Sequence, residues 1–251
     1  MHRCYRSEER MLELPKYIII ISYGKAALVM KWPKTITIEE ARSEQERLRK
    51  KVRLSPLRHD PSFVAGVDAA FSNERVFAAA CLYSFPELRL IERRLAVRKL
   101  RFPYVPGFLA FREGPAIIAA LNMLSRKPDV LLVDGQGIAH PRGFGIASYI
   151  GVQLDIPAIG CAKSRLIGSY EEPGNRKGTW SVLFFEDKVI GAVVRTRDNV
   201  RPLFISSGHK IDVKSAVSLA LSCLSNYRIP EPIRCADMLS KSGKRESTGP
   251  V

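Results

Sequence analysis

The sequence predicts a single α/β domain built around a mixed β-sheet, and three observations support this fold class. A length of 251 residues is sufficient for one large domain with its own hydrophobic core. Hydrophobic residues make up 46% of the chain and charged residues 26%, which is typical of a folded protein and argues against disorder, collagen or a coiled coil. From residue 130 onward, short apolar strand segments alternate with helical segments, a pattern that favours parallel strands joined by right-handed crossovers.

The first part of the chain is expected to contribute one helix followed by three strands. Residues 1–37 have neither helical nor strand periodicity, so we expect an N-terminal extension to which we assign no role. Apolar residues at helical spacing predict a solvent-facing helix over 41–52. Apolar runs over 63–71 and 76–85 flank a short polar turn and predict a hairpin, and residues 88–100 alternate well enough for a third strand.

The rest of the chain is expected to alternate between helices and strands and to end in a tail. We expect, in order, helix 116–124, strand 130–133, helix 146–154, strands 158–160, 180–185, 189–195 and 203–206, and helix 213–224. No repeat or linker interrupts this series, so residues 38–226 are expected to form one domain. Residues 227–251 are expected to be a C-terminal tail without a role.

Charge and cysteine content narrow the class of partner and the compartment. The chain has 40 Lys and Arg against 25 Asp and Glu, a net charge of +15 that favours a phosphate-rich partner such as nucleic acid, although solvated lysines alone can produce such a charge. Five cysteines without a Cys-x-x-Cys pair and four scattered histidines give no zinc-site spacing, so we expect reduced thiols and a cytoplasmic protein. The apolar stretch over 17–30 is too short and too interrupted to span a membrane, so no membrane partner is expected.

Two aspartates are the strongest candidates for chemistry. Asp68 and Asp134 each follow an apolar strand, where a sheet meets its loops. Brought together, the two carboxylates would repel each other unless a cation lay between them, and Mg²⁺ is a hard cation that prefers such oxygen ligands. The alternative for each residue alone is a capping role in a loop or at a helix end.

Two further residues are weaker candidates for the same site. Glu113 stands near an expected helix start and could provide a third oxygen ligand, although acidic residues are common there for dipole reasons alone. His209 follows a strand and could move a proton during hydrolysis, although a lone loop histidine is more often a surface residue.

Three other features suggest contacts with a nucleic acid. The segment 134–145 contains four glycines but does not match a dinucleotide or P-loop pattern, so we interpret it as a loop that lets the backbone approach an extruded base. Tyr104 lies in a proline-bounded turn over 103–107 and could be inserted into a base stack, or could simply pack against the fold. Lys163 follows a strand and could contact a phosphate, with a solvated lysine as the alternative.

Together these segments resemble the endonuclease V family over about residues 40–226. The matching motifs, in order, are 63–71, Pro-Tyr-Val-Pro-Gly at 103–107, Phe-Arg-Glu-Gly-Pro at 111–115, Val-Asp-Gly-Gln-Gly at 133–137, His-Pro-Arg at 140–142, Cys-Ala-Lys at 161–163 and Gly-His at 208–209. The resemblance implies a ribonuclease H-like fold, a mixed sheet flanked by helices. It also implies a DNA repair endonuclease that hydrolyses the second phosphodiester bond 3′ to deoxyinosine, leaving 3′-hydroxyl and 5′-phosphate ends through a metal-activated water.

The resemblance also implies a role for each matching residue. Asp68, Asp134 and Glu113 would bind Mg²⁺, for which Mn²⁺ can substitute, and His209 and Lys163 would take part in catalysis. Tyr104 would be the strand-separating wedge. The residues that would bind the substrate are Gly107, Leu109, Gly135, His140, Ile146 and Gly160, of which all but His140 would line the pocket for the base. The chain departs from the family pattern at Gly143 and Tyr149, where the family often has arginine and histidine, so phosphate contacts there are expected to differ.

Two other activities are compatible with the same residues. One is an endoribonuclease specific for inosine in RNA, because the sequence does not indicate which sugar is recognised. The other is a catalytically silent binder of deaminated nucleic acid. In each case we expect a monomer whose partner is nucleic acid containing deoxyinosine or another deaminated base.

Overall fold

The computed structural model describes residues 36–72 and 74–247, so nearly all of the expected extension over 1–37 lies outside the described residues. The strands are β1 (Phe63–Ser72), β2 (Arg75–Ser84), β3 (Leu90–Lys99), β4 (Val130–Asp134), β5 (Ala158–Ala162), β6 (Trp180–Phe185), β7 (Lys188–Val194) and β8 (Leu203–His209). The helices are α1 (Ile38–Arg49), α2 (Leu109–Leu121), α3 (Ile146–Leu154), α4 (Val213–Ser222) and α5 (Glu231–Glu246). Every strand expected from the sequence is present.

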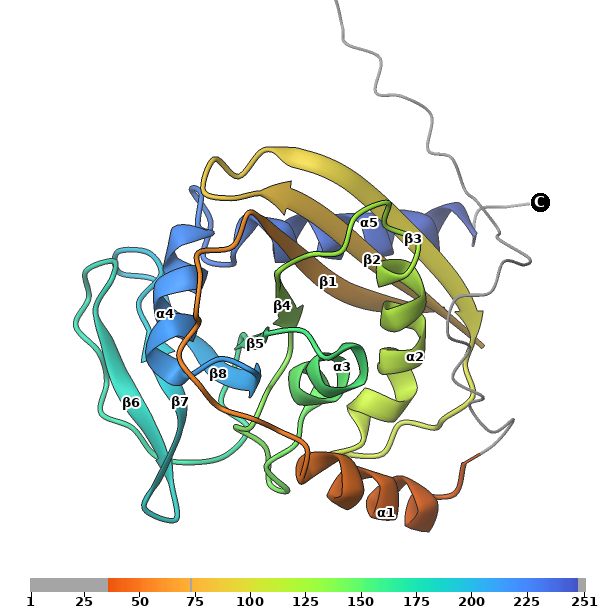
Figure 1. The fold of residues 1–251 in the computed structure, drawn as a ribbon, viewed down its shortest axis with the longest axis horizontal. Coiled ribbons are helices and arrows are strands. Elements are labelled where there is room, and N and C mark those ends of the chain that lie inside the picture. Colours follow the sequence, from red (N-terminus) through yellow and green to blue (C-terminus); the bar gives the residue numbers. More distant parts are fainter. Residues whose placement is uncertain (1–35, 73, 248–251) are drawn as a thin grey trace, which may run out of the picture.

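The strands form one mixed sheet in the order β3-β2-β1-β4-β5-β8-β7-β6 (Figure 1). Only the centre is parallel, because β1, β4 and β5 run in the same direction. The remaining neighbours pair antiparallel, including β8 with β5. The expected α/β class with a mixed sheet is therefore confirmed.

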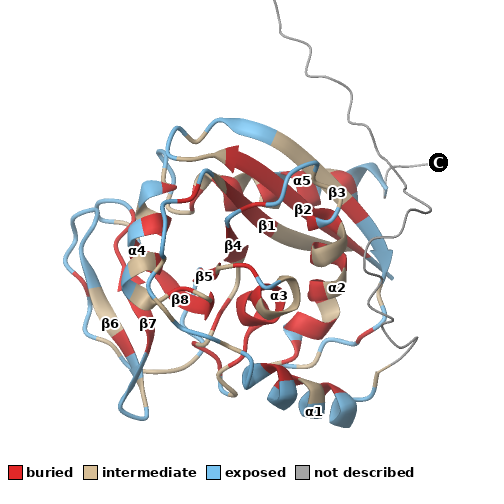
Figure 2. Ribbon diagram, in the orientation of Figure 1, coloured by how far each residue is buried: buried red, intermediate tan, exposed pale blue. Residues whose placement is uncertain are grey.

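Helices cover both faces of this sheet. One apolar cluster packs α1, α2 and α3 against one face, and a second packs α4 and α5 against the other. The central strands β4, β5 and β8 are almost wholly buried between the layers, whereas α1 exposes most of its surface (Figure 2). Alternate residues of a strand face opposite layers, which decides the helices that each strand side chain can reach.

Helix α2 begins seven residues earlier than the sequence predicts. Gly114 and Pro115 together indicate a turn, but in the structure both lie within the helix. Gly114 allows a close approach of α3, since a Cβ atom there would lie 2.5 Å from Cε1 of Tyr149. The extra turns carry Glu113, which is therefore a residue of the helix rather than of a loop.

The expected C-terminal tail is corrected by the structure, because most of residues 227–251 form helix α5. Its many charged residues made the segment resemble a solvated tail. Its buried positions, however, recur at helical spacing and face the sheet: Pro232, Ile233, Ala236, Leu239, Ser240 and Gly243. The helix packs across β1 and β2 (Figure 1) and so belongs to the domain core.

Within residues 36–72 and 74–247, none of the helices has the length and apolar character needed to cross a bilayer. Cys81, Cys161, Cys223 and Cys235 are free thiols.

Candidate active site

Three aspartates from distant parts of the chain lie together on the sheet face that α5 covers. Asp68 lies within β1 and Asp134 ends β4, and these strands pair in parallel with Val67 beside Val133. The aspartates come next in this register, so both side chains point to the same face. Asp237 lies on α5, which packs over β1. Carboxylate oxygens of the three residues lie within 4.8 Å of one another.

Helix α5 can approach β1 closely because β1 has a glycine at the crossing point. A Cβ atom on Gly66 would lie 2.0 Å from the carbonyl carbon of Pro232, so a larger residue would force the helix away from the strand. On the same helix, Ser240 places its Oγ atom 3.5 Å from Oδ2 of Asp68. The glycine therefore permits the approach that brings Asp237 to Asp68.

Negative charge is crowded in this acidic cluster of Asp68, Asp134 and Asp237. Burial and the nearby Asp134 carboxylate raise the pKa of Asp68 to about 7, and Asp237 acts in the same direction. Two lysines offset part of this charge. Nζ of Lys163 lies 2.5 Å from Oδ2 of Asp134, and Nζ of Lys241 lies 2.7 Å from Oδ1 of Asp237. Both lysine side chains are about half exposed, so the cluster is open to solvent.

The donor set of the acidic cluster suits a hard divalent cation. Mg²⁺ binds oxygen ligands at about 2.1 Å, so two of its ligands can lie up to roughly 4.2 Å apart, close to the spacing of these carboxylates. Burial is the largest cause of the raised pKa of Asp68, and the charges of Asp134 and Asp237 act in the same direction, so a cation bound there would relieve their mutual repulsion. Chemistry and spacing therefore both fit Mg²⁺ or Mn²⁺.

Glu113 lies near this cluster without being one of its closely spaced members. It is buried on α2, and burial followed by the charges of Asp68 and Asp134 raises the pKa of its carboxyl to about 8. Among the described residues, the group with ligand atoms within 4.8 Å of one another contains Asp237 and not Glu113. A ligand role for Glu113 stays a prediction, whereas its electrostatic proximity to the cluster is a feature of the structure.

The structure places His209 away from the acidic cluster, and a catalytic role for His209 stays a prediction. His209 pairs with Ala158 at the start of β5, whereas Asp134 pairs with Cys161 near its end, about 10 Å further along the strand. The imidazole is buried: Nδ1 accepts a hydrogen bond from the backbone N–H of Arg53, and Nε2 lies 3.2 Å from Oδ1 of Asp155. These contacts give His209 a structural role.

Sequence reasoning missed Asp237, which completes the cluster. Asp68 and Asp134 could be found because each follows an apolar strand. Asp237 lies in a charged helix, where an aspartate is unremarkable. The available signal was the helical spacing of Ile233, Ala236 and Leu239, which could have identified the segment as a packed helix but not which polar residue faces the sheet edge.

The glycine-rich loop over 134–145 lies beside the acidic cluster and is fixed by hydrogen bonds. The backbone N–H of Gly137 donates to Oγ of Ser206 at 2.8 Å, and Nε2 of Gln136 donates to the carbonyl of Ser164 at 3.1 Å. Gly160 lies directly against this loop, since its Cβ would be 2.4 Å from the nitrogen of Gly137. The loop therefore leaves the end of β4 at Asp134 and packs against Gly160 of β5 and Ser206 of β8.

The other residues expected to contact a base lie around this loop. A Cβ on Gly135 would lie 2.6 Å from Cγ2 of Ile146, so these two residues are neighbours. His140 is buried and hydrogen-bonds the backbone of Gly107, and burial lowers its pKa to about 4, so its ring is neutral at pH 7. Leu109 is 36% exposed at the start of α2. Their contact with a base stays a prediction.

The proline-bounded turn over 103–107 presents Tyr104 to solvent. The Tyr104 side chain is 72% exposed, and the guanidinium of Arg112 lies 6.0 Å from the centre of its ring. Gly107 ends the turn with φ +80°, a conformation that favours glycine. Tyr104 is therefore largely exposed rather than packed in the core, and its insertion into a base stack stays a prediction.

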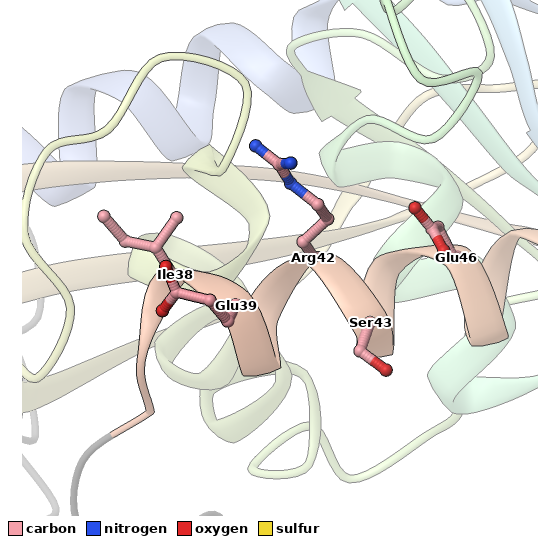
Figure 3. Close-up of a pocket in the computed structure, with 5 residues that line it drawn as sticks. All are labelled: Ile38, Glu39, Arg42, Ser43 and Glu46. Atoms are coloured by element: carbon pink, nitrogen blue, oxygen red, sulfur yellow. The ribbon is translucent and has the colours of Figure 1, made fainter.

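A shallow depression of about 240 Å³ lies on the solvent-facing side of α1 (Figure 3). It is lined by Ile38, Glu39, Arg42, Ser43 and Glu46. No residue of the acidic cluster contributes to it, so it is not a candidate for the reaction centre.

Comparison with known proteins was consistent across sequence and structure. Residues 46–238 match the endonuclease V family. Endonuclease V from Geotalea uraniireducens is 48% identical over 209 residues, covering 83% of this chain and 89% of the relative. Endonuclease V from Trichormus variabilis is 49% identical over 214 residues, covering 84% and 96%.

Solved structures show the same similarity. Endonuclease V from Streptomyces avermitilis superimposes with a TM-score of 0.82 at 40% identity, covering 87% of this chain and 97% of that one. Endonuclease V from Ciona intestinalis superimposes with a TM-score of 0.73 at 29% identity, covering 84% and 98%, and that protein is in complex with a DNA containing an inosine followed by a ribo-adenosine.

Proposed function

The chain belongs to the endonuclease V family and has its ribonuclease H-like fold, and from this premise we propose that it is a DNA repair endonuclease. It hydrolyses the second phosphodiester bond 3′ to deoxyinosine and leaves 3′-hydroxyl and 5′-phosphate ends. The observation that carries this proposal is the convergence of Asp68, Asp134 and Asp237 beside the glycine-rich loop. The Ciona intestinalis relative bound to inosine-containing DNA supports the choice of substrate.

Asp68, Asp134 and Asp237 would hold a divalent cation, Mg²⁺ or Mn²⁺. When bound, such a cation neutralises the carboxylates and acts as a Lewis acid toward the phosphodiester. Lys163 lies 2.5 Å from Asp134 and is partly exposed, so it can contact a phosphate at the edge of the cluster. Burial lowers the pKa of Lys163, but the hydrogen bond to Asp134 and the negative charges of the acidic cluster together raise it above its ordinary value, so the side chain stays positively charged.

Glu113 adds an acid whose protonation depends on the charge around it. Because its pKa lies at about 8, the carboxyl holds a proton at neutral pH. Positive charge placed between Asp68 and Asp134 would offset two of the causes of that raised pKa and so lower the pKa of Glu113, whereas burial, the largest cause, would remain. In this proposal Glu113 is the acid that the family resemblance assigns to the metal site.

Recognition of the lesion is assigned to the turn over 103–107 and to the glycine-rich loop over 134–145. The exposed ring of Tyr104 is inserted into the base stack, at a cost that a mismatched pair reduces. The glycine-rich loop, with Gly135, Gly160 and Ile146 in contact, accepts the extruded base. Basic residues elsewhere on the surface bind the phosphate backbone.

Cleavage-site mapping tests the proposal. Purified full-length protein with Mg²⁺ is expected to nick an inosine-containing duplex at the second bond 3′ to the lesion, and Asp134→Asn is expected to abolish nicking while binding stays measurable. The matched control is Asp187→Asn, an exposed residue in the β6–β7 hairpin, which should leave nicking unchanged. Binding without nicking by the wild type, with either Mg²⁺ or Mn²⁺, would favour a silent binder.

An inosine-specific endoribonuclease is the second candidate. It is favoured by the ribo-adenosine that follows the inosine in the DNA bound to the Ciona intestinalis relative. Parallel cleavage of DNA and RNA oligonucleotides of the same sequence decides between the two, because only the 2′-hydroxyl differs.

A further inference from the structure

Gln45 is the polar side chain that α1 buries against the rest of the domain. It is 1% exposed, although most of α1 faces solvent. A buried amide must satisfy both of its N–H groups and its oxygen, otherwise the unpaired group destabilises the fold. All three requirements are met, and each partner lies far from Gln45 in the sequence.

The amide of Gln45 joins the two segments that are assigned to lesion recognition. Its Nε2 donates to the carbonyl of Gly107 at 3.2 Å. Gly107 is the last residue of the turn that carries Tyr104. The same nitrogen donates to the carbonyl of Phe144 at 2.9 Å, in the glycine-rich loop. One side chain therefore fixes the distance between the turn and the loop.

Arg142 closes this network from the side of the glycine-rich loop. Its Nε donates to Oε1 of Gln45 at 2.5 Å, and its Nη2 donates to the carbonyl of Gly107 at 2.6 Å. Its guanidinium also lies 4.2 Å from the ring centre of Phe108, the residue after the turn. With the hydrogen bond from His140, the Gly107 carbonyl accepts from three side chains.

Gly107 lies directly against the Arg142 side chain within this network. A Cβ on Gly107 would lie 2.4 Å from Nη2 of Arg142, so the turn and the loop are already in close contact. The geometry determines the relative position of the exposed Tyr104 ring and the loop beside the acidic cluster.

We infer that Gln45 is a positioning residue that holds the Tyr104 turn in register with the glycine-rich loop, so that strand separation and capture of the base occur together. This inference rests on the proposed function. It assigns α1, which contributes nothing to the acidic cluster, a part in the recognition of double-stranded substrate. Gln45 acts through the Gly107 carbonyl and Arg142 and contacts no reacting atom.

Two variants separate the roles of the amide. Gln45→Met fills a similar volume and removes all three hydrogen bonds. Gln45→Glu keeps an oxygen for Arg142 but cannot donate to Gly107 or Phe144 at neutral pH. Arg47→Gln is the control on the same helix, since Arg47 is exposed and pairs with Glu44.

The experiment compares kcat and KM on an inosine-containing duplex with those on the same strand alone. For both Gln45 variants we expect kcat on the duplex to fall by about tenfold or more, because small displacements of positioning groups have large effects on rate. On the single strand, where no stack must be opened, we expect less than about threefold change. Equal losses on both substrates, or no loss on either, would overturn the inference.

Hydrogen exchange on the full-length Gln45 variants distinguishes a local loosening of the turn and the loop from a general loss of stability. Faster exchange confined to the peptides over 103–108 and 143–145 is expected, while exchange throughout β1, β4 and β5 stays as in wild type. Unchanged exchange in those two peptides would contradict it. Failure of the wild type to cleave either inosine substrate would instead reject the proposed function.

Discussion

At the scale of a single residue, burial and the nearby negative charges raise the pKa of Asp68, and a bound cation would relieve this repulsion. A pKa of about 7 at Asp68 means that the folded, cation-free protein holds a proton there that the unfolded chain, with an ordinary aspartate, releases near pH 4. The protonated carboxyl of Asp68 therefore favours the folded state fully below about pH 4, and this contribution to the free energy of unfolding is lost as the pH rises through about 7.

We therefore expect Asp68→Asn to stabilise the cation-free protein increasingly as the pH rises. In the presence of a chelator, the free energy of unfolding of the variant relative to wild type should increase from pH 5 to pH 8, because only wild type acquires the buried negative charge. Chemical denaturation at both pH values measures it. A difference that is the same at the two pH values would contradict the raised pKa of Asp68.

Asp237 and His209 give the second prediction at this scale. Asp237→Asn should reduce nicking of inosine-containing DNA by about 100-fold or more and weaken Mn²⁺ binding, because it removes an anionic oxygen from the acidic cluster.

His209→Gln should lower thermal stability, because the contacts of the imidazole with Arg53 and Asp155 are lost, and should retain the affinity for Mn²⁺. Titration calorimetry with Mn²⁺ distinguishes the two variants. Loss of Mn²⁺ binding in His209→Gln would show that His209 contributes to the cation site.

At the scale of elements, the direction of a strand explains why Asp134 lies in the acidic cluster and His209 lies away from it. Asp134 ends β4 and Lys163 follows β5, and these strands are parallel, so both residues lie at the same edge of the sheet. His209 also ends a strand, but β8 runs antiparallel to β5 and therefore ends at the opposite edge. Local sequence predicts where a strand ends, but pairing direction depends on long-range contacts.

Helices were predicted less completely than strands, again for identifiable reasons. Helix α3 begins and ends where the sequence predicts, because its apolar run is bounded by a glycine-rich loop. The start of α2 was missed because Gly114 and Pro115 usually mark a turn. Helix α5 was missed because its exposed face is highly charged, and its burial depends on the close approach at Gly66.

The crossing of α5 over β1 gives a prediction at the scale of elements. In Gly66→Ala the added methyl group would overlap the backbone at Pro232, so α5 should shift. We expect a loss of about 1–3 kcal/mol in stability, typical of overpacking, together with weaker Mn²⁺ binding. Gly174→Ala is the control, since its Cβ would make only ordinary contact with Thr179 at 3.4 Å. Thermal unfolding and calorimetry measure both effects, and unchanged values for Gly66→Ala would refute the role given to this crossing.

At the scale of the whole molecule, charge and fold have separate functions. The sheet and its helices place three carboxylates at one edge, while a net charge of +15 is expected to attract the phosphate backbone of a nucleic acid. The composition predicts such an attraction but not the position of the site, because net charge contains no information about position.

Binding to DNA is therefore expected to weaken steeply as salt concentration increases. If several Lys and Arg residues contact phosphates, log Kd should change linearly with log salt concentration, with a slope that gives the number of contacts. Fluorescence anisotropy between about 50 and 200 mM salt, with Ca²⁺ in place of Mg²⁺, measures the slope. An affinity for DNA that does not depend on salt concentration would contradict electrostatic binding of the phosphate backbone.

The most direct test is to locate a bound cation by anomalous diffraction from crystals of the full-length protein grown with Mn²⁺. We expect one anomalous peak in contact with carboxylate oxygens of Asp68, Asp134 and Asp237. A peak elsewhere, or one from which Asp237 or Asp68 is too distant to be a ligand, would contradict the shared site on which the proposed hydrolysis depends.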